Sequence, residues 1–80
     1  MAKTTSEKVA AAKRLIDSCD NKILQYGIGY VKLRGVDGVG RQDLETIKMY
    51  CNYFIENKTI GGLMPPHGVV ASVLKNIDIV

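Results

Sequence analysis

The middle of the chain, residues 26–47, constrains the fold more than any other stretch. It reads YGIGYVKLRGVDGVGRQDLETI and contains a short alternation of apolar and charged residues at 30–34. An Asp-Gly pair, Asp37-Gly38, follows between two valines. This pair favours a type I′ turn, because both central positions of such a turn need a positive φ angle. The sequence therefore predicts a β-hairpin over residues 30–41, with its turn at Asp37-Gly38.

An amphipathic helix is predicted before the hairpin, over residues 5–26. Thr4 and Glu7 have the spacing of a capping box, in which each side chain accepts a hydrogen bond from the other residue's backbone N–H, and Gly27 is a suitable residue to end the helix. The apolar positions recur every three or four residues: Val9, Ala12, Ile16, Cys19 and Ile23, widened by Ala11, Leu15 and Leu24. This spacing also fits a coiled-coil dimer, but two heptads are short for one, so we expect the helix to pack within its own chain.

Two further helices are predicted after the hairpin. The first, over residues 42–58, opens with carboxylates, which the helix dipole favours there, and carries a broad apolar stripe. The second is short, over residues 66–77, because Pro66 suits the first turn of a helix. The apolar residues 77–80 either pack on the core or insert into a neighbour. The predicted fold class is α+β: a small single domain over residues 1–80, with two antiparallel helices, a short hairpin between them and a short C-terminal helix.

The composition is that of an ordinary globular domain, with 46% hydrophobic and 24% charged residues. Eighty residues bury only a small core, so a partner that covers apolar surface is physically attractive. The net charge of +3 is compatible with a nucleic-acid partner but does not indicate one. The two cysteines lack CxxC spacing, which predicts reduced thiols rather than a disulfide framework. No segment has the pattern of a secretory signal or of a membrane span, so we expect a protein that is not secreted and does not contact a membrane.

No arrangement of residues in the sequence predicts catalysis. The one histidine, His67, adjoins a Pro-Pro pair and is expected to be a surface or capping residue. The glycines at 35, 38 and 40 match neither a phosphate-binding loop nor a dinucleotide-binding motif, so turn geometry explains them better. Catalysis usually needs a concave pocket with convergent polar groups, which so short a chain has little room to build. We expect no enzyme activity, no cofactor, no metal and no small-molecule substrate.

The outer face of the predicted hairpin is the candidate binding surface. If the valine and leucine of the alternating run face the core, the residues between them point to the opposite face. These are Tyr30, Lys32 and Arg34, with Arg41 just beyond them. Such a basic edge with one aromatic residue suits an acidic partner, either a protein subunit or DNA phosphate. The alternative is a solvated outer face of a small sheet.

Three segments carry a resemblance to a known family: ILQYG at 23–27, YVKLRG at 30–35 and VGRQDLETI at 39–47. They resemble the small gpW-type head completion proteins of tailed phages. In that family a helix ends at a glycine, a short alternating strand follows, and a turn leads to an Asp-Leu pair that opens the second helix. The resemblance covers about residues 9–57, and residues 59–80 have no counterpart in it.

The resemblance implies a non-enzymatic virion protein, a head–tail connector or head completion component. Such a protein is bound in a ring under the portal, where DNA passes and the tail attaches, so it would act first in the host cytoplasm and then in the virion. The implied partners are portal or tail subunits, or copies of the chain in a ring, and non-specific contact with DNA phosphate is also compatible with this role. By position, Lys32, Arg34 and Arg41 are the candidates for contact with portal or DNA.

Two alternative functions remain open at this point. Residues 41–57, 64–66 and 69–77 resemble the first two helices of a winged helix-turn-helix domain, joined by a Pro-Pro linker like that of LexA-type repressors. Such a regulator reads DNA with a further helix, and residues 69–77 are almost devoid of the polar side chains that recognise bases. The other alternative is a small phage protein that inhibits a host protein by binding it.

Overall fold

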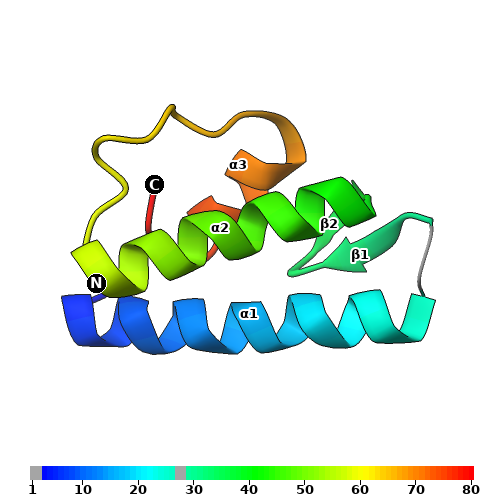
Figure 1. Ribbon diagram of the computed structural model, residues 1–80, viewed down its shortest axis with the longest axis horizontal. Helices are drawn as coiled ribbons and strands as arrows, with labels where there is room; N and C mark the ends of the chain where they lie inside the picture. Colours follow the sequence, from blue (N-terminus) through cyan, green and yellow to red (C-terminus); the bar gives the residue numbers. More distant parts are fainter. Residues whose placement is uncertain (1–2, 27–28) are drawn as a thin grey trace.

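The computed structural model describes residues 3–26 and 29–80, and in them three helices pack with one antiparallel hairpin, which lies at one end of the two long helices (Figure 1). The elements follow one another as α1 (Thr5–Tyr26), β1 (Val31–Leu33), β2 (Val36–Val39), α2 (Arg41–Asn57) and α3 (Gly68–Lys75). This arrangement confirms the α+β class, with the hairpin between the two long helices and a short helix near the C-terminus. Gly27, which was expected to end the first helix, lies outside the described residues.

Helices α1 and α2 lie side by side and run in opposite directions (Figure 1). The predicted capping box opens α1, because the Thr4 N–H donates to Glu7 Oε1 at 3.0 Å and the Glu7 N–H donates to Thr4 Oγ1 at 3.2 Å. Between the helices, Lys48 Nζ lies 2.6 Å from Asp20 Oδ1. The apolar face of α1 is therefore covered by α2 of the same chain, as expected. Leu24 is an exception, since it is 84% exposed rather than part of the core-facing stripe.

The core lies between α1, α2, the hairpin and α3. Its largest fully buried side chains come from every helix and from β2: Leu15, Ile47, Leu74, Val39, Val73, Cys19 and Cys51. Because these elements enclose a single cluster of buried residues, each of them contributes to the burial of the others. A two-stranded hairpin alone is marginal in water, so its position depends on this shared cluster.

The hairpin turn is not where the sequence predicted it. The chain reverses at Arg34 and Gly35, whose φ angles are 51° and 81°, and Leu33 pairs with Val36. Two positive φ angles in a two-residue loop are the requirement of a type I′ turn, so the geometry was predicted correctly but assigned to the wrong pair of residues. The Asp37-Gly38 pair lies within β2 instead.

The reason for this placement is the burial of the β2 valines. Val36 and Val39 are three residues apart, so in a regular strand they would point to opposite faces of the sheet. The structure pairs Val31 with Val39 and Leu33 with Val36, which leaves Asp37 and Gly38 opposite a single residue of β1. This β-bulge, with Gly38 at a φ of 75°, turns both valines toward the core.

The C-terminal helix is shorter than the predicted range of 66–77. His67 has extended backbone angles, φ −143° and ψ 170°, so the helix begins only at Gly68 and residues 59–67, here called the strap, cross the surface as an irregular connection. The last residues pack on their own chain, because Ile77 and Ile79 are 4% and 6% exposed. Of the two placements open for this segment, the structure has the intramolecular one.

Candidate functional site

The four residues predicted to bind a partner occupy one end of the molecule, along the hairpin and the start of α2. Tyr30 directly precedes β1, Lys32 is the middle residue of β1, and Arg41 is the first residue of α2. Arg34 lies in the turn rather than on the outer face of the strand, which corrects the predicted position of its side chain. All four residues are exposed, and they are called the hairpin surface below.

The structure brings Tyr30 and Arg41 together, although they are eleven positions apart in the sequence. Both residues line a hollow of about 300 Å³ with Gly29, Gly40, Gln42 and Asp43. The hairpin causes this proximity, because its antiparallel strands return the chain from residue 31 to residue 39. An aromatic residue and an arginine thus line one hollow.

The three cations of the hairpin surface have no ion-pair partners among the residues that the structure describes. Asp37 is also exposed, and it belongs to the bulge that faces Lys32. The backbone carbonyl of Arg34 accepts a hydrogen bond of 2.7 Å from Asn76 Nδ2. This bond ties the turn that carries Arg34 to the segment after α3.

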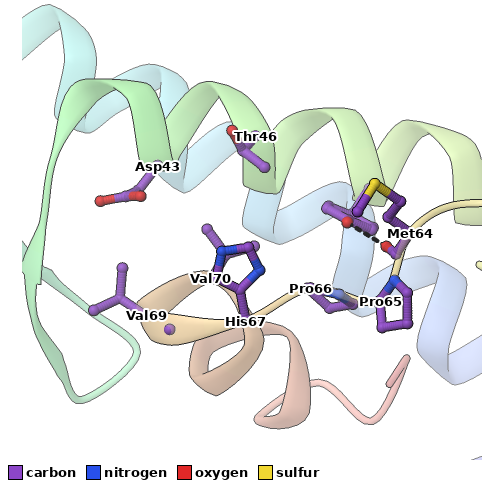
Figure 2. Close-up of a pocket in the computed structure, with 10 residues that line it drawn as sticks. Asp43, Thr46, Met64, Pro65, Pro66, His67, Val69 and Val70 are labelled. Carbon is purple, nitrogen blue, oxygen red and sulfur yellow. Dashed lines mark hydrogen bonds between the residues drawn. The ribbon is translucent and has the colours of Figure 1, made fainter.

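A second hollow of about 380 Å³ lies between α2 and the end of the strap (Figure 2). Asp43 and Thr46 line it from α2, and His67 lines it from the residue before α3. The polar groups from α2 are already used locally: Asp43 Oδ2 accepts from the Gly40 N–H at 3.0 Å, and the Thr46 hydroxyl donates to the Gln42 carbonyl at 2.9 Å. The His67 side chain is exposed, as the sequence predicted. The arrangement resembles the capping of a helix more than a set of convergent catalytic groups.

Two tyrosines of α2 have a role that the sequence analysis did not find. The Tyr50 hydroxyl donates to the Met64 carbonyl at 2.6 Å (Figure 2), and the Tyr53 hydroxyl donates to the Gly61 carbonyl at 3.0 Å. Both bonds hold the strap on α2. For Tyr50 a signal was present, because a buried tyrosine on the apolar stripe of a helix needs an acceptor for its hydroxyl. Nothing local in the sequence indicates which carbonyl is that acceptor.

The two cysteine thiols are poorly reactive at neutral pH. Both side chains are fully buried in the core, and this burial raises the pKa of Cys19 to about 11 and that of Cys51 to about 12. Since the thiolate is the nucleophile and the metal ligand, neither group is poised for either task at neutral pH. In the described part of the chain, no group of three or more His, Cys, Asp or Glu side chains is placed to hold a metal ion.

Comparison with known proteins identifies no family for this chain. No family model, no curated protein and no solved structure matches the chain. The resemblance to the gpW-type proteins therefore stays a prediction from the sequence. Among the helices of the described residues, none is both long enough and apolar enough to cross a bilayer.

Proposed function

We propose that this chain is a non-enzymatic assembly protein that docks on a partner protein through the hairpin surface. The observation that carries the proposal is that an exposed aromatic residue, Tyr30, lines one hollow with Arg41, a cation that has no ion-pair partner among the described residues. Tyrosine and arginine are among the residue types enriched at the energetic hot spots of protein interfaces. Lys32 and Arg34 add positive charge along the same hairpin. Such a surface suits an acidic patch on a protein subunit.

The resemblance to gpW-type proteins suggests which partner this is. We propose a head–tail connector or head completion role, in which the chain docks on a portal-like ring of a tailed phage. The chain would then be found in the host cytoplasm before assembly and in the virion afterwards. Contact with DNA phosphate is compatible with this role, because exposed lysine and arginine attract phosphates without regard to sequence. No catalytic step is part of the proposal.

The helix-turn-helix alternative has little support from the observed α3. Val70, Val73 and Leu74 are buried in the core, and the helix begins with Gly68 and Val69 rather than with polar side chains that hydrogen-bond to base edges. The N-terminal residues of a recognition helix are those that contact bases in the major groove. We therefore do not propose a sequence-specific DNA regulator.

The proposal is tested with the portal-type protein encoded nearest to this chain, purified as a ring. Size-exclusion chromatography with light scattering should show the chain eluting with the ring. The double charge reversal Lys32→Glu, Arg34→Glu should abolish that co-elution, because it replaces two attractive charges by two repulsive ones. The matched control reverses Lys13 and Arg14, two exposed cations of α1, and should leave docking unchanged.

Two results would contradict the proposed function. One is co-elution that survives the hairpin reversal or that is lost equally in the α1 control, because the hairpin surface would then not be the contact. The other comes from a gel-shift titration at two salt concentrations. Non-specific phosphate contacts weaken steeply with salt, so specific duplex binding that persists at physiological salt would favour a DNA regulator instead.

A further inference from the structure

Gly40, the residue directly before α2, lies against the side chain of Tyr30, although its backbone angles do not require glycine. Its φ and ψ angles are −84° and 174°, a conformation that any residue adopts. A side chain at this position would instead press on a neighbouring ring. A Cβ atom on Gly40 would lie 3.2 Å from Tyr30 Cε1 and 3.4 Å from Tyr30 Cδ1. The Tyr30 ring therefore lies directly against the Cα of Gly40.

This contact supports one edge of a ring that is otherwise exposed to solvent. Tyr30 is 79% exposed, so an unsupported side chain would sample several rotamers. Gly40 is itself buried, and its N–H is held by Asp43 Oδ2 at 3.0 Å, so the backbone under the ring belongs to the start of α2. The ring thus has one edge on a fixed backbone and the rest of its surface open, beside the Arg41 side chain that lines the same hollow.

We propose that Tyr30 is the anchor of the hairpin surface and that Gly40 is the residue that positions it. A ring already held in its bound orientation loses little conformational entropy on binding. The partner that fits this pair presents an acidic side chain to Arg41 next to an apolar side chain that covers the Tyr30 ring. This inference rests on the proposed docking function, and Gly40 acts only through Tyr30.

The seating of the ring is tested in the isolated protein by NMR. Nuclear Overhauser effects should connect the Tyr30 ring protons with the Gly40 Hα protons. The variant Gly40→Ala should shift the Tyr30 ring resonances, because the new methyl group occupies the space beneath the ring. The matched control is Gly61→Ala in the strap, where φ is not positive and a Cβ would meet only Thr59 Oγ1 at 3.3 Å. That control should leave the Tyr30 resonances in place.

The anchoring role is tested by a double-mutant cycle on binding to the purified portal-type ring. Tyr30→Ala should weaken binding by about tenfold or more, as for an interface hot spot, and Gly40→Ala should weaken it several-fold. In the Tyr30→Ala background, Gly40→Ala should have no further effect, because the ring that it displaces is gone. Arg41→Gln should weaken binding and reduce its salt dependence. Gly61→Ala should bind as the wild type does.

The outcomes separate this inference from the proposed function. Absence of the ring-to-Gly40 Overhauser effects would overturn the seating. Equal weakening by Gly40→Ala with and without the Tyr30 ring would show a purely structural role for Gly40 and overturn the positioning role. If the wild-type chain binds the ring and the Tyr30→Ala variant binds it equally well, the anchoring role is overturned while the docking function stands. If the wild-type chain does not bind the ring at all, the docking function fails and the anchoring role fails with it.

Discussion

Replacing Arg34 by asparagine should make the protein more stable, although it removes a charged residue and introduces a poor strand former. Arg34 has a φ of 51°, in the left-handed region that costs an ordinary L-residue roughly 1–2 kcal/mol. Asparagine tolerates this region better, and Asn-Gly is the preferred pair for a type I′ turn. The hydrogen bond from Asn76 goes to the backbone carbonyl, so the substitution retains it. We expect Arg34→Asn to raise the free energy of unfolding by about 0.5–1 kcal/mol.

Urea denaturation and differential scanning calorimetry measure this change. For a domain of this size the melting temperature should rise by roughly 2–8 °C. The matched control is Lys32→Asn, an exposed cation of β1 whose φ is not positive, where asparagine should leave stability unchanged or lower it by up to about 1 kcal/mol. If the turn were at Asp37-Gly38, position 34 would also be a strand position. A loss of stability in Arg34→Asn that matches the control would therefore refute the observed turn.

Three further predictions concern the core, the strap and the thiols. Leu24→Glu should change the free energy of unfolding by less than about 0.5 kcal/mol, because the side chain is exposed. Leu15→Ala should lower it by about 2–5 kcal/mol, because Leu15 is fully buried. Equal effects of the two variants in urea denaturation would contradict the observed burial. Tyr50→Phe removes the hydrogen bond to the strap carbonyl and should lower the free energy of unfolding by about 1 kcal/mol. NMR should also show faster amide exchange in the strap, and unchanged exchange would show that the hydroxyl does not hold the strap. Burial raises the pKa values of Cys19 and Cys51, so iodoacetamide at pH 8 should modify neither thiol in the native protein and both thiols in denaturant. Mass spectrometry measures the modification, and rapid labelling of the native protein would show that the core opens.

The position of the candidate site could be predicted from the sequence only in part. The alternation at residues 30–34 correctly indicated that Tyr30 and Lys32 are exposed, because neighbouring residues of a strand point to opposite faces. It could not show that the Tyr30 ring rests on Gly40, since that contact exists only after the hairpin has closed. Nor could it show that the strap carbonyls are the acceptors for the α2 tyrosines.

The sequence by itself determined the long helices. Capping and a repeat of three and four residues are local signals, so the bounds of α1 coincide with the predicted residues 5–26 and those of α2 differ by one residue at each end. The turn was decided by the tertiary structure. Asp37-Gly38 has the stronger local preference for a type I′ turn, but a turn there would place Val36 and Val39 on the face of the sheet opposite to Val31 and Leu33. The observed pairing of Leu33 with Val36 and of Val31 with Val39 brings all four side chains to the core-facing side. Full burial of Val39 and partial burial of Val36 offset the strain of one arginine at positive φ, so the chain turns at Arg34-Gly35 and forms a bulge at the predicted turn.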